Sequence, residues 1–206
     1  MENQSPETQE SQMQSPEELA ANCNTEVAEF FEMDEIGGIK VINCPTKEEL
    51  IKVWLGYNPD KKQNDAPDYL VAFSPDKDIY ILSTDTMPPY QHSEVSGPER
   101  YKMVLKHELV HKYLSKIPGA KVSWLEEGTC SHIANQPYPK WDEADITAGL
   151  LRDLSHTKDG RKYAVGKNIV DRIVGEYGKE KLFEIIKMED REERNSELQR
   201  MFPWLK

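Results

Sequence analysis

Two histidines and a glutamate carry the clearest chemical pattern in the sequence. His107, Glu108 and His111 form an H-E-x-x-H motif inside the stretch 98–116, whose periodicity predicts a helix. Residues four apart project from one face of a helix, so both imidazoles can bind one Zn²⁺ ion. Glu108 lies about 100° round the helix from His107, where it can act as general base on a water held by the metal. The alternative is a solvated helix face or a structural ion pair.

A carboxylate that could be the third ligand stands at the start of the next predicted helix. The segment W-L-E-E-G at residues 124–128 follows a short turn and opens a helical stretch over 123–134. It contains two adjacent carboxylates, Glu126 and Glu127. Zinc accepts a carboxylate beside two imidazoles, so this segment strengthens the prediction of a metal site.

The H-E-x-x-H motif followed by W-L-x-E-G resembles the gluzincin metallopeptidases, the thermolysin-like and aminopeptidase-N-like enzymes in which a glutamate is the third zinc ligand. The resemblance implies that Glu127, immediately before the glycine, is this ligand and that Glu126 points elsewhere. A third match, Y-x-x-G from Tyr163 to Gly166, stands at the start of a helix predicted over 160–177. In the family a tyrosine at this place stabilises the transition state. A half-buried aromatic residue on an amphipathic helix is the alternative.

The resemblance covers about residues 69–180 and includes departures from the family pattern. The G-x-M-E-N segment of the large aminopeptidases is absent before His107, so endopeptidase action is expected rather than aminopeptidase action. Ser131 stands where thermolysin-like members carry an aspartate that orients a histidine ligand, and its hydroxyl can accept from an imidazole N–H without a charge. The run 78–83 is expected to be the family's edge strand, which pairs with the extended substrate backbone.

Three other residues near the motif have simpler interpretations. Cys130 follows Glu127 by three residues and could compete for the metal, but a buried cysteine that acts as a small hydrophobic residue is favoured. His92 and His132 have no partner at ligand spacing and are expected to be polar surface residues. Three cysteines cannot all pair within one chain, and the N-terminus lacks the pattern of a secretory signal, which favours a reducing, cytoplasmic setting.

Hydrophobic periodicity predicts an α+β domain over residues 36–206, with strands first and helices after. A strand begins at Ile39 and a helix over 46–54 follows it; the β-rich runs 69–73 and 78–83 are joined by S-P-D-K, which suits a hairpin. The expected helices span 98–116, 123–134, 142–157, 160–177, 179–188 and 190–200. The resemblance narrows this architecture to a zincin-like catalytic domain, with a small sheet and a mostly helical C-terminal half.

The formal charge of −11 is concentrated at the N-terminus. Residues 1–35 hold ten carboxylates and no Lys or Arg, whereas residues 36–206 hold 27 acidic and 26 basic side chains. The first region is expected to be an acidic tail, disordered over 1–14, with a helix over 15–33 whose apolar side docks on the body or on a partner. The charge disfavours nucleic acid and anionic membranes as partners, and no apolar run approaches the roughly 20 residues of a membrane-spanning helix.

Together these patterns predict a zinc-dependent hydrolase that cuts peptide bonds in peptide or protein substrates. His107, His111 and Glu127 would hold Zn²⁺. Glu108 would take the proton of the water and pass it to the leaving amine, and Tyr163 would donate to the oxyanion. Two alternatives stay open: a catalytically silent peptidase-fold protein that binds peptides or a partner, and a latent enzyme whose acidic tail and N-terminal helix occupy the cleft.

Overall fold

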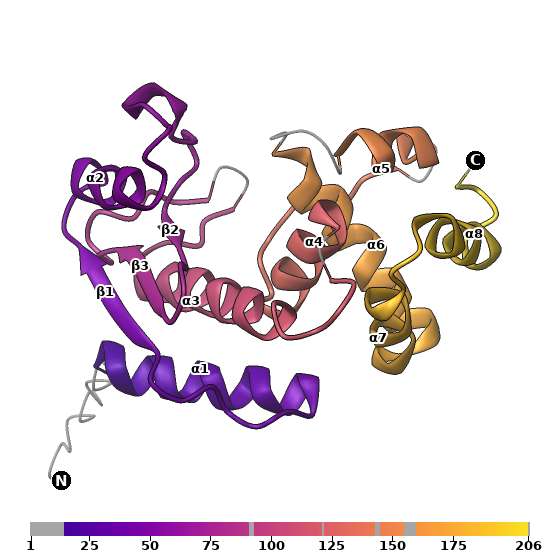
Figure 1. Cartoon of the computed structure of the whole chain (residues 1–206), viewed down its shortest axis with the longest axis horizontal. Helices are drawn as coiled ribbons and strands as arrows, with labels where there is room; N and C mark the ends of the chain where they lie inside the picture. The colour runs from indigo at the N-terminus through magenta and orange to yellow at the C-terminus, as the bar shows by residue number, and fades with distance from the viewer. Residues whose placement is uncertain (1–14, 91–92, 121, 143–144, 155–159, 206) are drawn as a thin grey trace, which may run out of the picture.

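The computed structural model describes residues 15–90, 93–120, 122–142, 145–154 and 160–205. A small sheet and one helix form one end of the molecule, and a group of helices forms the other (Figure 1). The elements of the first end are β1 (Lys40–Cys44), α2 (Lys47–Tyr57), the short helix η1 (Gln63–Asp65), β2 (Ala72–Phe73) and β3 (Asp78–Leu82). The other helices are α1 (Pro16–Phe31), α3 (Gly97–Leu114), α4 (Ser123–Ile133), α5 (Ala148–Leu154), α6 (Arg161–Tyr177), α7 (Lys179–Lys187) and α8 (Arg191–Met201). The predicted α+β class is confirmed.

Strand β3 lies in the middle of the three-stranded sheet, parallel to β1 and antiparallel to β2. The expectation that the run 78–83 is an edge strand is therefore wrong. The physical reason is the apolar run in β3: Ile79 and Ile81 are fully buried and Leu82 is almost so, as suits a strand flanked on both sides. The predicted hairpin is confirmed, with Phe73 paired to Tyr80, and its shorter strand β2 is the one at the edge.

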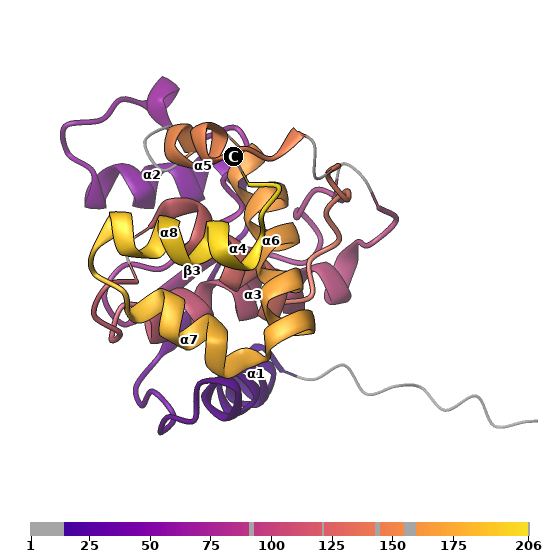
Figure 2. The same ribbon diagram turned by 90° about the vertical axis from the view of Figure 1, so that its right-hand side faces the viewer.

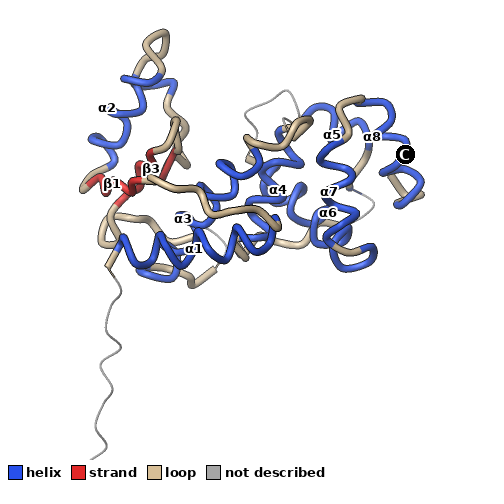
Figure 3. Tube along the Cα trace, turned by 60° about the horizontal axis from the view of Figure 1, so that its bottom comes forward, coloured by secondary structure: helices blue, strands red, loops and turns tan. Residues whose placement is uncertain are grey.

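Helix α1 begins at the predicted capping signal. The Glu18 N–H donates to Ser15 Oγ over 3.2 Å, and the Ser15 N–H donates to Glu18 Oε2 over 3.0 Å, a complete capping box. The helix ends where Glu32 adopts a left-handed conformation. It lies beside α3 in both Figure 1 and Figure 3. Its buried face includes Phe31, whose ring stacks on Tyr113 of α3 with centroids 5.6 Å apart, so this apolar side docks on the body.

A buried hydrogen-bond network holds the chain after α1 to the same place. The fully buried Tyr113 donates its O–H to Asn24 Oδ1 over 2.7 Å and accepts from the Ile36 N–H over 3.2 Å. Asn24 Nδ2 in turn donates to the Ile36 carbonyl over 3.2 Å. The N-terminal helix therefore shares its core with α3, the helix that carries the H-E-x-x-H motif.

Helices α4 and α6 cross with their backbones in contact at two glycines. A Cβ atom on Gly128 would lie 2.4 Å from the carbonyl carbon of Gly166, and one on Gly166 would lie 2.1 Å from the Trp124 carbonyl oxygen. No side chain fits between the helices at this point. Helices α7 and α8 form an outer pair at this end of the molecule (Figure 2).

The remaining helix predictions agree with the structure except near α5. The predicted helix 142–157 is described only as the seven-residue α5, and the flanking positions 143–144 and 155–159 lie outside the described residues. The disorder predicted for 1–14 also falls outside them. No helix in the described part of the chain is both long enough and apolar enough to cross a membrane.

Candidate metal centre and its pocket

The two motif histidines of α3 and one glutamate of α4 converge on a common point. Glu127 Oε2 lies 3.2 Å from His107 Nε2 and 3.5 Å from His111 Nε2. The two imidazole rings lie 4.9 Å apart between centroids, as expected for residues one helical turn apart. The structure thus brings together the three residues predicted as metal ligands.

Each imidazole has an oxygen acceptor on the nitrogen that faces away from this point. His107 Nδ1 is 3.1 Å from Gln136 Oε1, and His111 Nδ1 is 2.9 Å from Glu126 Oε1. Because an amide oxygen and a carboxylate accept, each Nδ1 donates to its partner, and each Nε2 faces Glu127 Oε2. An Nε2 that carries a proton donates to this carboxylate, and an Nε2 without a proton has a lone pair for a metal ion. This is the arrangement that orients histidines as metal ligands.

One expectation about these outer partners is wrong, and Ser131, which was able to accept from a histidine, does not do so. Glu126 does not point elsewhere, since its position in the first turn of α4 directs its carboxylate to His111. Ser131 makes no hydrogen bond to a histidine: its buried Oγ has no partner among the described residues. Gln136 takes that place, held in the loop after α4 by a bond from its N–H to the Ser131 carbonyl over 2.9 Å. Gln136 follows the end of the predicted helix 123–134, and no motif in the sequence marks it.

Glu127 is held as a carboxylate by three cationic or donor neighbours. Lys162 Nζ lies 2.8 Å from Oε1, which leaves Oε2 facing the imidazoles. Burial by itself raises the pKa of the Glu127 carboxyl, but the hydrogen bonds with His107 and His111 outweigh burial and hold this pKa well below its usual range. No motif in the sequence marks Lys162, although it stands directly before Tyr163.

Cys130 lies beside the same histidines. Its sulfur and one nitrogen each of His107 and His111 lie within 4.8 Å of one another. The thiol is fully buried, and burial raises its pKa to about 12, which keeps it protonated. The histidines are therefore flanked by two residues of α4, the charged Glu127 and the neutral Cys130.

A pocket of about 810 Å³ opens beside this centre. Its lining includes His107 and Glu108 from α3, the segment 67–72 that leads into β2, the loop 136–139 and Tyr163 from α6. The two residues predicted to be catalytic, Glu108 and Tyr163, are therefore in the same cavity. Glu108 is 9% exposed.

Tyr163 is fixed by aromatic neighbours. Its ring centroid lies 6.0 Å from that of His107, 6.1 Å from that of Tyr138 and 5.8 Å from that of Tyr69. Burial raises the pKa of Tyr163 far above its usual value, so the phenol keeps its proton and acts as a hydrogen-bond donor.

His132, expected to be a surface residue, is half-buried and has a partner in α6. Its Nδ1 lies 2.7 Å from Asp171 Oδ1, and Lys167 Nζ lies 2.6 Å from the other oxygen of that carboxylate. The contact ties α4 to α6 and leaves His132 outside the metal centre. His92 lies outside the described residues.

Comparisons of the chain with protein-family models, with curated proteins and with solved structures found no match. The functional proposal therefore rests on the geometry of the site.

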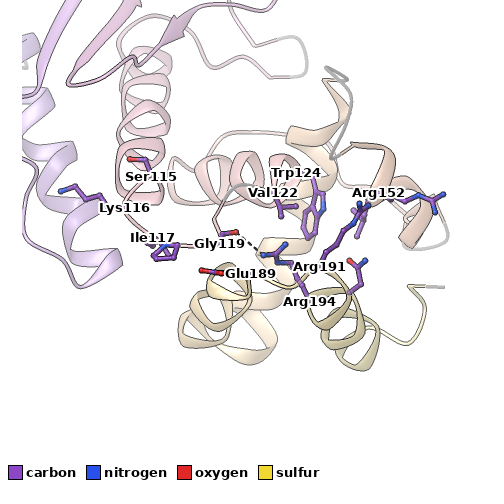
Figure 4. A pocket seen from close by; sticks show the side chains of 13 residues that line it. Ser115, Lys116, Ile117, Gly119, Val122, Trp124, Arg152, Glu189, Arg191 and Arg194 are labelled. Carbon is purple, nitrogen blue, oxygen red and sulfur yellow. Dashed lines mark hydrogen bonds between the residues drawn. The ribbon is translucent and has the colours of Figure 1, made fainter.

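A second pocket, of about 620 Å³, lies between the turn after α3 and α8 (Figure 4). Its most buried cation, Arg194, is 4% exposed and donates to the backbone carbonyls of Gly119 and Ile185, both over 3.2 Å, and of Met188. The dashed line in Figure 4 marks the bond to Gly119. Arg194 thus connects α8 to the turn before α4.

Proposed function

We propose that this protein is a zinc-dependent peptidase of the gluzincin type with a zincin-like catalytic domain. The observation that carries the proposal is the convergence of His107 Nε2, His111 Nε2 and Glu127 Oε2, with the two imidazole nitrogens 3.2 and 3.5 Å from the carboxylate oxygen. Glu108 and Tyr163 line a pocket together with His107, so the acid–base groups share one cavity with one of the three donor residues.

The donor chemistry fits zinc. Two imidazole nitrogens and one carboxylate oxygen are a common catalytic zinc set, in which the remaining position is left open. In its neutral form each imidazole keeps the proton on Nδ1, where Gln136 or Glu126 accepts the hydrogen bond, and its Nε2 can bind the metal. When bound, zinc supplies Lewis acidity, which polarises a peptide carbonyl and makes water more acidic.

The chain's own residues supply the remaining steps of hydrolysis. Glu108 accepts a proton from the attacking water and donates it to the amine that leaves. Tyr163 donates its O–H to the carbonyl oxygen, where negative charge develops in the transition state. Gln136 and Glu126 keep the two imidazoles oriented throughout. Lys162 keeps one carboxylate oxygen of Glu127 in place.

The edge strand supports binding of an extended substrate. Within the described part of the chain, strand β2 pairs with β3 on one side only, and the segment 67–72 that enters it lines the pocket. A peptide laid along the other side of β2 would gain main-chain hydrogen bonds with little sequence preference. Helix α1 contributes no residue to the pocket, so inhibition by this helix is not part of the proposal.

The test is hydrolysis of a mixed peptide library, read by mass spectrometry, with zinc-loaded protein and with protein treated with a chelator. We expect cleavage that zinc restores. The variant Glu108→Gln should bind zinc with unchanged stoichiometry and lose at least about 100-fold in rate, as expected for loss of general-base catalysis. The matched control is Glu99→Gln, an exposed glutamate of the same helix.

Three outcomes would contradict the proposal: the absence of stoichiometric zinc, equal rates for Glu108→Gln and wild type, and zinc-dependent binding of peptides with no cleavage. The last result would favour a catalytically silent protein that binds peptides.

A further inference from the structure

Arg100 is a buried cation with no anionic partner. It stands in the first turn of α3, is 7% exposed and lines the same pocket as His107 and Glu108. Its Nε and Nη1 atoms are buried without a hydrogen-bond partner. Among the described residues, no carboxylate lies within 4.0 Å of its guanidinium. Burial of an unpaired charge costs free energy. An arginine without a partner in a pocket wall is therefore unusual.

The neighbours of Arg100 do not neutralise it. Its guanidinium carbon lies 4.3 Å from the ring centroid of Tyr90, a cation–π contact. Burial raises the pKa of Tyr90 to about 12, so this phenol is neutral. The Tyr90 hydroxyl is itself buried without a partner and lines the pocket. Two polar groups with unused donors therefore lie side by side in one wall.

Arg194 shows how this chain otherwise satisfies a buried arginine. It is 4% exposed, close to the 7% of Arg100, yet its guanidinium donates to three backbone carbonyls. Arg100 has none of these bonds, although both guanidinium groups pay for removal from water. The difference indicates that the described residues do not supply the partner of Arg100.

The position of Arg100 along α3 indicates how far its partner would lie from the bond that is cut. It precedes His107 by seven residues on one helix, a rise of roughly 10 Å at 1.5 Å per residue. An extended peptide advances about 3.3 Å per residue, so roughly three substrate residues span this distance. One guanidinium with one phenol suits a carboxylate, which accepts bidentate donation from arginine.

We infer that Arg100 and Tyr90 form a subsite that binds a carboxylate of the substrate, about three residues from the bond that is cut. The inference rests on the proposed peptidase function and names the substrate class: acidic peptides. The carboxylate is either a free C-terminus or an Asp or Glu side chain.

The experiment measures binding to zinc-loaded Glu108→Gln protein, in which turnover is blocked. The probes are alanine-based octapeptides that carry one glutamate or one glutamine at each position in turn, each made with a free and with an amidated C-terminus. We expect at least a tenfold tighter Kd for one glutamate position over glutamine, or for the free acid over the amide. The first result identifies a side-chain carboxylate, and the second identifies the terminal one.

Variants of Arg100 separate a binding role from a structural one. In the Glu108→Gln background, Arg100→Met should abolish the tenfold preference and leave the Kd of the neutral peptides within about twofold, and Arg100→Lys should retain part of the preference. The Tm of Arg100→Met should equal or exceed that of wild type, because the unpaired buried charge is gone. The matched control Lys102→Met removes an exposed charge two residues away that pairs with Glu26, and should keep the preference.

The failures of the two proposals are distinguishable. Zinc-dependent cleavage with no preference for any carboxylate would overturn the subsite and keep the peptidase. Equal preferences in wild type and Arg100→Met, or a Tm of Arg100→Met several degrees below that of wild type, would also overturn the subsite. If no library peptide is cut in the presence of zinc, the peptidase proposal fails first.

Discussion

Gly128 and Gly166 pack backbone against backbone, so that helices α4 and α6 meet with no side chain between them. Glu127 directly precedes the first glycine, and Tyr163 lies three residues before the second. The crossing therefore fixes how far the candidate ligand lies from the candidate oxyanion donor. It also gives a physical reason for a glycine after Glu127 and another in Y-x-x-G.

We predict that Gly166→Ala destabilises the protein by about 2–3 kcal/mol or more, because the added methyl group overlaps the Trp124 carbonyl. The control is Gly175→Ala on the same helix, where nothing lies within 4 Å of the new carbon and helix propensity should add about 0.5–1 kcal/mol. Urea denaturation measures both. Equal stability of the two variants would show that the helices can separate at low cost.

Substitution of the acidic and thiol neighbours of the histidines should weaken zinc binding to different degrees. We expect Glu127→Gln to weaken zinc binding most, and Glu126→Ala to weaken it about 10- to 100-fold through loss of the hydrogen bond to His111 Nδ1. Cys130→Ser should change the affinity little, because its buried thiol is protonated. Competition with a chromophoric chelator measures the three constants. A loss for Cys130→Ser larger than that for Glu127→Gln would instead assign the site to His107, His111 and Cys130.

Zinc should stabilise the folded chain. An ion present at 100 times its Kd adds about 2.7 kcal/mol to the free energy of unfolding if the unfolded chain does not bind it. We therefore expect Tm to rise with zinc and to fall again with a chelator, as measured by calorimetry. His107→Ala should show neither change, whereas His132→Ala, which loses its contacts with Asp171 and Phe30, should keep both. A zinc-dependent Tm in His107→Ala would place the ion elsewhere.

Tyr163→Phe should lower kcat by about 100-fold, a loss typical of one oxyanion donor, with KM and Tm little changed. The reason is that its hydroxyl acts in the transition state, whereas the aromatic packing against Tyr138 is kept. Steady-state kinetics on a cleaved library peptide measures the effect. Tyr177→Phe at the far end of α6, whose hydroxyl donates to Met201, serves as control. Similar kcat values for the two variants would remove Tyr163 from the mechanism.

Tyr113→Phe should destabilise the protein by about 1–3 kcal/mol, because Asn24 and the Ile36 N–H both lose a buried partner. Tyr57→Phe, at a tyrosine that is 44% exposed, should stay within about 0.5 kcal/mol of wild type. Chemical denaturation compares them. A neutral Tyr113→Phe would mean that this buried hydrogen-bond network adds nothing to the stability of the fold.

Local signals predicted the elements well. The capping residue Ser15, the turn before β3 and the spacing of His107 and His111 each act over a few residues, and each marked an element that the structure contains. The order of the strands was not predicted, because the pairing of Val41 with Ile79 joins segments far apart in the chain. Hydrophobic periodicity within one segment does not indicate which distant segment it pairs with.

The residues that surround the candidate ligands were also not predictable from the sequence. Gln136 lies in a loop, and Lys162 reaches Glu127 from another helix. Arg100 occupies an ordinary position in the first turn of α3, and only its burial without a partner distinguishes it. These roles depend on how helices and loops are arranged in space.

The three converging residues lie close together in the sequence, which affects the order in which parts of the site form during synthesis. His107 and Glu127 are separated by 20 residues, and the entropic cost of closing a loop rises only with the logarithm of its length. Helix α6, with Lys162 and Tyr163, comes later in the chain. If zinc binds as proposed, a nascent chain can assemble its donor atoms before α6 completes the wall of the pocket, so that capture of the ion and completion of the cavity are separate events in time.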